Sequence, residues 1–162
     1  MTEFRPSWEE YFLAIAFIIS SRSRDIETKH GAIITDKNNI ILGTGYNSFI
    51  KNINDNLIPK TRPGKYPFMI HAEENALLNC KILPREVMGG GTVYITGQPC
   101  NNCFQKLIQG GVERFIIAKR QGTKLETKET IKIFKFLVKQ TKVTIKYINF
   151  NKNWILNYLN HF

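Results

Sequence analysis

Apolar positions in this chain recur at helical spacing in some segments and form short β-rich runs in others. The apolar run 11–19 follows Ser7 and Glu10, whose spacing of three is that of a capping box, so a helix is expected from near Trp8. The same reasoning, helped by glycines just past helix ends, predicts four more helices, the last of them short, over residues 72–78, 100–109, 127–139 and 154–159.

Five β-rich runs alternate with these helices. The first two flank the turn-forming segment 36–39, which indicates a hairpin. Because the later strands are separated by helices, parallel pairing is expected in the second half of the chain. The pattern therefore predicts an α/β fold with a mixed sheet of about five strands between helices, the strands covering residues 32–35, 40–43, 92–95, 114–118 and 144–148.

Two polar segments are expected to be loops. Residues 20–29 are short and polar, whereas residues 48–67 form a long stretch with three prolines. Irregular loops of that length inside a compact domain are usually functional. No repeat or linker interrupts the pattern, so we expect one domain over residues 1–162, with its core at about 8–148 and a C-terminal extension at 149–162.

Length and hydropathy exclude several classes of protein. A chain of 162 residues with 43% hydrophobic content is long enough for one buried core and is not a disordered or fibrous sequence. Its longest apolar run, 11–19, is far shorter than the roughly 20 residues that span a bilayer. The N-terminus lacks the pattern of a secretory signal. We therefore expect a cytoplasmic protein without a membrane partner.

The chain is strongly basic, with 23 Lys and Arg against 13 Asp and Glu and a formal charge of +10. Such an excess favours anionic partners such as nucleotides or nucleic acid. Abundant Lys, Ile and Asn also fit the codon bias of an AT-rich genome. Four lysines in the predicted helix 127–139 form either a basic stripe or an ordinary solvated face opposite its apolar side: Lys128, Lys132, Lys135 and Lys139.

An odd, small number of cysteines argues against a disulfide framework. Cys100 and Cys103 form a C-x-x-C pair, which is typical of either redox or metal chemistry. Cys80 lies in an apolar helical run and is expected to be a buried structural thiol.

The residues with the clearest chemistry are His71-Ala72-Glu73 and Pro99-Cys100-Asn101-Asn102-Cys103. Together they form the H-x-E…P-C-x-x-C signature of zinc deaminases. One imidazole and two thiolates supply three zinc ligands and leave a fourth position for water, whose pKa the metal lowers to about 7. Glu73, two residues from His71, is placed to move protons to and from that water. A closed structural zinc site would need a fourth ligand from Cys80, His30 or His161.

At this point the chain resembles the deoxycytidylate (dCMP) deaminase family of the cytidine deaminase-like superfamily. The likeness covers residues 20–119 and rests on Ser23-Arg24-Asp25, on Gly45-Tyr46-Asn47 and on the two zinc segments. It implies a three-layer α/β/α fold and zinc-dependent hydrolysis of dCMP to dUMP and ammonia, which feeds dTMP synthesis. It also implies a homo-oligomer, commonly a hexamer, with dCTP and dTTP as candidate effectors and no nucleic-acid partner.

The resemblance assigns roles to individual residues. His71, Cys100 and Cys103 would hold one Zn²⁺ per subunit, whose hydroxide attacks C4 of the base, and Glu73 would shuttle the protons. Asn47 would hydrogen-bond the nucleotide. The remaining substrate-binding candidates are Ala72 and Pro99 beside the metal motifs, Arg24 and Lys29 for the phosphate, and, in the long loop, Lys60, Arg62 and Lys65.

The chain departs from the family pattern in places. Ser48 stands where many members carry Gly, and His30 stands where Val is usual, either as a metal ligand or as a loop histidine. Residues 49–57 differ from the family's small loop, which helps to form the effector site in regulated members.

Three other functions share parts of this pattern. A tRNA adenosine deaminase has the same two zinc motifs, and the basic final third of the chain would suit RNA. A free-nucleoside cytidine deaminase commonly has Cys where His71 stands. A non-catalytic nucleotide or nucleic-acid binder could keep the fold, but it would have no need of Glu73.

Overall fold

The computed structural model describes residues 5–120 and 127–160. A five-stranded sheet with the order β2-β1-β5-β6-β7 forms its centre. The β1 strand pairs antiparallel with β2 and β5, whereas β5, β6 and β7 run parallel, so the predicted mixed sheet is confirmed. The strands are β1 (Gly31–Asp36), β2 (Ile41–Tyr46), β5 (Gly91–Ile95), β6 (Val112–Ala118) and β7 (Thr144–Ile148).

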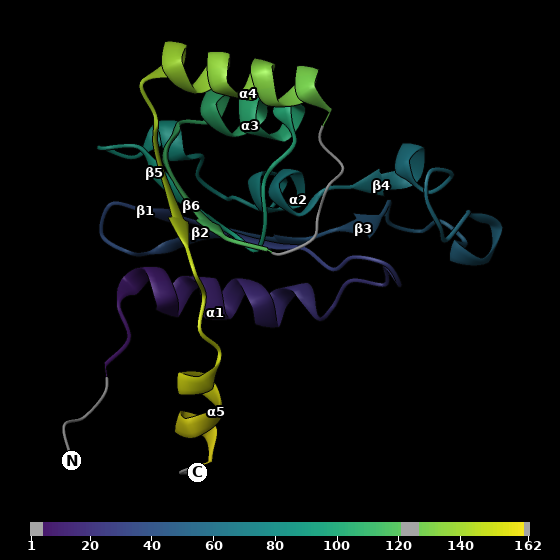
Figure 1. Cartoon of the computed structure of the whole chain (residues 1–162), viewed down its shortest axis with the longest axis horizontal. Helices are drawn as coiled ribbons and strands as arrows, with labels where there is room; N and C mark the ends of the chain where they lie inside the picture. The colour runs from purple at the N-terminus through teal and green to yellow at the C-terminus, as the bar shows by residue number, and fades with distance from the viewer. Residues whose placement is uncertain (1–4, 121–126, 161–162) are drawn as a thin grey trace.

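Helices cover both faces of this sheet, which gives the expected α/β/α layers (Figure 1). The α1 helix lies on one face, and α2 and α3 lie on the other with α4 beyond α3. The α5 helix projects past α1, on the side away from the sheet. The helices are α1 (Trp8–Ser20), α2 (Ala72–Leu78), α3 (Asn101–Gln109), α4 (Lys128–Thr141) and α5 (Asn153–Leu159).

Two apolar clusters hold the layers together. Phe12 and Leu13 of α1 pack against Ile33 and Ile116 on one side of the sheet. On the other side, Phe104 of α3 meets Phe115 of β6 with ring centroids 4.7 Å apart. Buried apolar area of this kind is the main favourable contribution to folding.

The start of α1 confirms its predicted capping box. The Glu10 amide donates to the Ser7 hydroxyl at 3.3 Å, and the Ser7 amide donates back to the Glu10 carboxylate at 3.1 Å. Two of the amides that a helix start leaves unpaired are satisfied in this way.

The α2 helix packs directly on strand β2, with no side chain between them. A Cβ added at Gly43 would lie 2.3 Å from the Ala76 carbonyl oxygen, and one at Gly45 would lie 2.2 Å from the Ala76 amide nitrogen. This close approach explains why β2 is longer than the predicted strand 40–43, because glycines weaken the β signal but are needed there. It also sets the height of α2 above the sheet.

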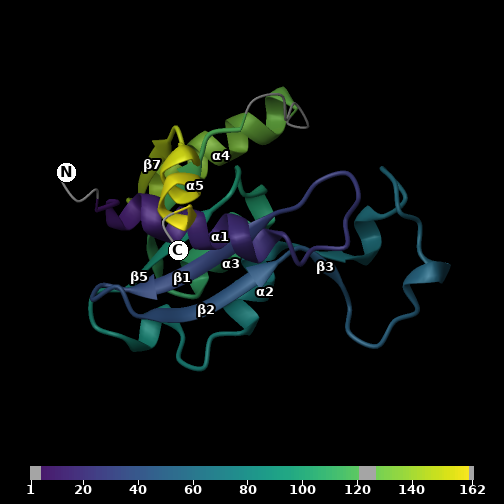
Figure 2. The ribbon, with the colours of Figure 1, turned by 90° about the horizontal axis from the view of Figure 1, so that it is seen from below.

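The long segment between β2 and α2 extends from one end of the sheet (Figure 2). It contains two short paired strands, β3 (Ser48–Phe49) and β4 (Met69–Ile70), and two 3₁₀ turns, Asp55–Leu57 and Tyr66–Phe68. It is therefore more ordered than the single loop predicted from its composition.

Two further expectations can be compared with the structure. Cys80 is half-buried rather than fully buried, although it packs against the apolar cluster of α3 and burial raises the pKa of its thiol to about 11. The four lysines of α4 are exposed, while Phe134, Leu137 and Val138 face the core. None of the described helices has the length and hydropathy needed to cross a bilayer.

Candidate metal centre and substrate cavity

The three predicted metal ligands come together at the starts of two helices. His71 immediately precedes α2, Cys100 immediately precedes α3, and Cys103 lies in the first turn of α3. The His71 Nδ1 atom lies 3.6 Å from the Cys100 Sγ atom and 3.4 Å from the Cys103 Sγ atom. A tetrahedral zinc ion with Zn–N near 2.1 Å and Zn–S near 2.3 Å separates N from S by about 3.6 Å. The donor atoms therefore fit one zinc ion.

The protonation states of these donors are strongly biased. The pKa of Cys100 falls to about 4 because its sulfur accepts hydrogen bonds from Cys103 and from His71. The pKa of Cys103 rises because the neighbouring Cys100 thiolate takes its proton as a hydrogen bond. The pKa of His71 rises, chiefly through its contact with Cys100. Thiolate is the form that binds a metal, and the start of α3 also favours negative charge.

Glu73 lies beside these donors and is buried. Burial raises the pKa of its carboxyl group to about 7. A carboxyl group with such a pKa can both accept and release a proton near neutral pH, which is the requirement for a general acid and base.

A cavity of about 340 Å³ opens from the metal donors. His71, Glu73 and Cys100 line one end of it, with Ala72 and Pro99 beside them. Residues from three loop segments also line the cavity, and we call them the loop wall: Asp25, Thr28, His30, Asn47, Arg62 and Lys65.

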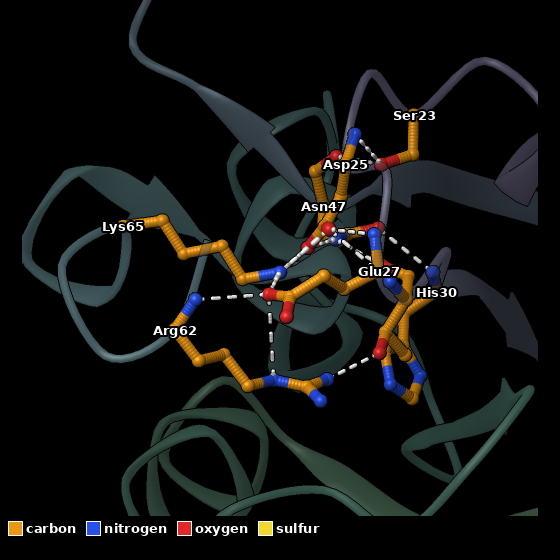
Figure 3. Close-up of polar contacts among 8 residues, drawn as sticks. Ser23, Asp25, Glu27, His30, Asn47, Arg62 and Lys65 are labelled. Carbon is orange, nitrogen blue, oxygen red and sulfur yellow. Dashed lines mark hydrogen bonds and ion pairs between the residues drawn. The ribbon is translucent and has the colours of Figure 1, made fainter. Parts of the chain in front are cut away.

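A buried ion-pair network supports the loop wall (Figure 3). The side chain of Lys65 is only 2% exposed, and its ammonium group donates to both oxygens of Asp25 at 2.6 and 2.7 Å. The same ammonium group lies 2.9 Å from the Glu27 carboxylate. Burial alone would raise the pKa of Asp25, but the Lys65 contact and backbone amides outweigh it and hold that pKa below its usual range.

Asn47 joins this network through its whole amide group. Its Nδ2 donates to Asp25 at 3.2 Å and to the Thr28 carbonyl at 2.9 Å, while its Oδ1 accepts from the His30 amide at 2.7 Å. Both amide hydrogens are therefore used inside the protein, and one lone pair of Oδ1 is left for a ligand. Asn47 lines the cavity, with most of its hydrogen-bonding capacity holding the loop.

Arg62 places its guanidinium group on the loop wall. Its Nη2 donates to the Thr28 hydroxyl, and its backbone amide donates to Glu27 at 3.0 Å. Its Nε is buried and makes no hydrogen bond to any atom of residues 5–120 and 127–160, but it lies 3.9 Å from the Glu27 carboxylate in an ion pair. Because the side chain of Arg62 lines the cavity, its guanidinium group is a candidate for binding an anionic ligand.

The other predicted phosphate candidates lie elsewhere. The side chain of Arg24 is 80% exposed and pairs with Asp55 at 2.5 Å, and the Lys29 ammonium group donates to the Ser21 carbonyl. Neither lines the cavity, and Lys60 does not line it either. Arg24 instead lines a second cavity of about 340 Å³, together with Arg22 and residues 49–53.

Sequence reasoning missed the network behind the loop wall. The spacing of Asp25, Glu27 and Lys65 carries no metal-like or catalytic pattern, and an ion pair between residues 40 positions apart leaves no local signal. Arg62 was one of several loop cations, and nothing in the sequence separated it from Lys60.

Comparisons with known proteins agree with the zinc-binding motifs described above. The family profile described as "Cytidine and deoxycytidylate deaminase zinc-binding region" matches residues 6–119. Mouse deoxycytidylate deaminase is 32% identical over 159 residues, covering 89% of this chain and 88% of the mouse protein. The enzyme of Mycobacterium phage D29 is 34% identical, covering 71% of this chain and 97% of its own length. The human enzyme is 36% identical over 67% of this chain, which spans 63% of the human protein.

Solved structures share the fold. A dCMP deaminase from the cyanophage S-TIM5, solved in complex with dCMP and dUMP, superposes with a TM-score of 0.66 at 24% identity over 90% of this chain and 100% of its own. A chain from a study of tRNA:A34 deaminases superposes with a TM-score of 0.52 at 15% identity, over 88% and 100%. At these identities the likeness concerns the architecture alone.

Proposed function

This chain belongs to the cytidine and deoxycytidylate deaminase zinc-binding family, and we propose that it hydrolyses dCMP to dUMP and ammonia. The observation that carries the proposal is the meeting of three metal donors and the buried Glu73 at one end of a cavity of nucleotide size. The proposed substrate is that of the deoxycytidylate deaminases to which the chain is similar over 71–89% of its length.

His71, Cys100 and Cys103 would hold the zinc ion. When bound by three protein ligands, zinc keeps a position for water and lowers the pKa of that water to about 7. Glu73 accepts a proton from the attacking water and delivers one to N3 of the cytosine ring as the water oxygen bonds to C4. Glu73 then takes the remaining proton from the new C4 hydroxyl and carries it to the amino group, so that the C4 carbonyl forms, the C4–N bond breaks and ammonia leaves. Its pKa of about 7 suits both directions of transfer.

The remaining cavity residues orient the nucleotide. Ala72 and Pro99 flank the base beside the metal donors, and Asn47 offers the free lone pair of Oδ1. We assign the 5′-phosphate to Arg62, because it lines the cavity, whereas Arg24 and Lys29 do not, and a guanidinium suits a phosphate. Arg24 and Lys29 are the competing candidates.

Regulation and assembly are separate proposals. We propose that the chain acts in the cytoplasm as a single-domain homo-oligomer, a hexamer on the family pattern. The second cavity, with Arg22 and Arg24 at its edge, is the candidate position for dCTP or dTTP. Three cations line this cavity, Arg22, Arg24 and Lys51, and cations suit a nucleoside triphosphate.

Ammonia release from zinc-loaded protein tests the proposed function. The substrates are dCMP, dCTP, CMP, deoxycytidine and an adenosine-containing tRNA stem-loop, each with and without added dCTP or dTTP. We expect dCMP to have the highest kcat/KM. Turnover on dCMP no faster than on deoxycytidine would contradict the proposal. Release from the stem-loop alone would favour an RNA substrate, and inactivity on every substrate would favour a binding role.

A further inference from the structure

His30 lies on the loop wall with its backbone fixed in both directions. Its amide donates to the Asn47 Oδ1 at 2.7 Å, and its carbonyl accepts from the Asn47 amide at 3.2 Å (Figure 3). The residue immediately precedes β1 and lines the same cavity as Glu73 and His71. These two hydrogen bonds fix the backbone from which the imidazole extends and so restrict how far the ring can move.

The ring itself is placed by shape rather than by hydrogen bonds. Neither ring nitrogen bonds to an atom of the part of the chain that the structure describes. On one side the ring lies against Gly97, where an added Cβ would come 2.9 Å from the His30 Cε1 atom and 3.3 Å from its Nδ1. The absence of a side chain at position 97 therefore leaves room for this imidazole.

The surroundings keep the imidazole uncharged. Burial is the largest cause, followed by the positive charge of Arg120 and of His71, with Arg62 adding to it and Asp25 opposing it, so the pKa of His30 falls to about 4. A neutral imidazole has one N–H donor and one acceptor nitrogen. Such a group suits a neutral polar partner and brings no positive charge to the binding of a phosphate.

We propose that His30 determines substrate specificity by hydrogen-bonding a neutral group of the bound nucleotide, either the pyrimidine O2 or a sugar hydroxyl. The proposal rests on the proposed function, because it requires the metal donors to take the C4 end of a bound cytosine in the cavity that His30 also lines. His30 does not enter the metal set, since the ligand atoms that lie within 4.8 Å of one another belong to His71, Cys100 and Cys103 among the described residues.

The test compares His30→Val and His30→Asn with the wild type, holding the phosphate constant. The substrates are dCMP, CMP and 2′,3′-dideoxy-CMP. Loss of one neutral hydrogen bond is expected to raise KM for dCMP roughly 3- to 10-fold in His30→Val, with kcat changed by less than about 2-fold. If a sugar hydroxyl is the partner, removal of the 3′-hydroxyl raises KM for the wild type but does not raise KM further for His30→Val. If O2 is the partner, removal of the 3′-hydroxyl raises KM equally for both proteins.

Two further variants separate recognition from folding. Gly97→Ala keeps the imidazole but pushes it aside, and because the backbone at position 97 is not left-handed, alanine is tolerated there. Gly97→Ala should raise KM for dCMP, as His30→Val does. Ile26→Ala is the matched control, because Ile26 lies in the same loop but is 73% exposed and does not line the cavity. Its KM values should equal those of the wild type.

Product affinity gives a readout that does not depend on turnover. The dissociation constant for dUMP, measured by calorimetry on zinc-loaded protein, should be roughly 3- to 10-fold weaker in His30→Val than in Ile26→Ala. Equal KM values and equal dUMP affinities in the two variants would overturn the assignment of His30. If the wild type does not turn over dCMP, the proposed function fails, and the dUMP comparison still decides the role of His30.

Discussion

The cavity has two walls of opposite construction. The metal end is built from two short motifs at helix starts, and its donors are left free to bind an ion. The loop wall is built from segments around residues 25–30, 47 and 62–65, and its charges mostly satisfy one another. The comparison teaches that residues which act on a ligand and residues which hold a shape need different partners. An acting residue keeps a free donor or acceptor, whereas a supporting residue uses them all.

The loop wall nevertheless keeps groups that make no hydrogen bond among the described residues. They are the ring of His30, one lone pair of the Asn47 Oδ1 and the Nε of Arg62, which lies 3.9 Å from the Glu27 carboxylate. Each belongs to a residue whose backbone or remaining side-chain atoms are tied to the network. The network therefore holds a few recognition atoms in place, while the chemistry lies at the metal end. Four predictions probe this division, in decreasing order of expected effect.

Glu73→Gln probes the metal end most directly. The substitution preserves size but removes proton transfer, which typically contributes 10²- to 10⁴-fold. We expect kcat on dCMP to fall by about 10³-fold or more. Zinc content by atomic absorption and the unfolding midpoint should remain near wild-type values, because Glu73 is not one of the three donors. Substantial remaining activity would contradict the role of Glu73.

Lys65→Met probes the support of the loop wall. It leaves the buried Asp25 carboxylate without its cation, and breaking a buried pair in this way costs about 3–5 kcal/mol. Urea denaturation measures the change in the free energy of unfolding. Lys106→Met is the matched control, because its pair with Glu74 has the same 2.6 Å separation but side chains that are 42% and 32% exposed. That variant should lose less than about 1 kcal/mol. Similar losses in the free energy of unfolding of the two variants would contradict the distinction between the buried and the exposed ion pair.

The free energy of unfolding, measured against pH in the wild type and in His30→Asn, isolates the contribution of His30. The folded protein keeps a pKa of about 4 at this residue, against 6.5 in the unfolded chain. The unfolded state therefore binds the extra proton first, so the contribution of His30 to the free energy of unfolding falls as pH drops from 6.5 to 4, by at most about 3 kcal/mol. Glu73, whose folded pKa is about 7, contributes in the opposite direction over this range in both proteins, so the effect is the difference between the wild-type and variant curves. His30→Asn should remove this part of the slope. Asp25, whose folded pKa is lowered, contributes a loss only at pH values below its ordinary pKa. Parallel curves for wild type and variant above pH 4 would contradict the prediction.

Arg62→Leu and Arg24→Ala compare two cations that could bind the phosphate. If Arg62 binds it, KM for dCMP should rise roughly 10- to 100-fold in Arg62→Leu, since a charge-assisted hydrogen bond contributes about 1.5–3 kcal/mol. KM for deoxycytidine should stay constant, because it has no phosphate. Arg24→Ala removes an exposed pair and should change neither value by more than about 2-fold. The reverse pattern would move the phosphate to Arg24.

The fold and the metal end could be predicted from sequence because their signals are local. The capping box of Ser7 and Glu10, the hairpin turn and the two zinc motifs each occupy a few consecutive residues. Strand β2 was predicted too short because Gly43 and Gly45, required by the contact with α2, break a β-rich run. The order within residues 48–67 was missed because its short strands depend on pairing with each other.

The loop wall could not be predicted for a different reason. Lys65 and Asp25 meet only after the chain has folded, and nothing in a run of polar residues distinguishes a buried lysine from an exposed one. The departure at His30 was visible, but its meaning depends on Gly97, which is distant in sequence and follows β5, the antiparallel neighbour of β1.

The glycine contact between α2 and β2 has a consequence for how this gene can vary. A methyl group at position 45 would push against the α2 backbone and carry Glu73 with it, and a misplacement near 1 Å costs about 100-fold in rate. In a library of variants selected for growth that depends on the product of this enzyme, substitutions at positions 43 and 45 should therefore be eliminated as strictly as substitutions in the metal motifs. The two glycines would be retained like catalytic residues, although they touch no substrate. Accepted substitutions would be confined to the exposed outer faces of the helices.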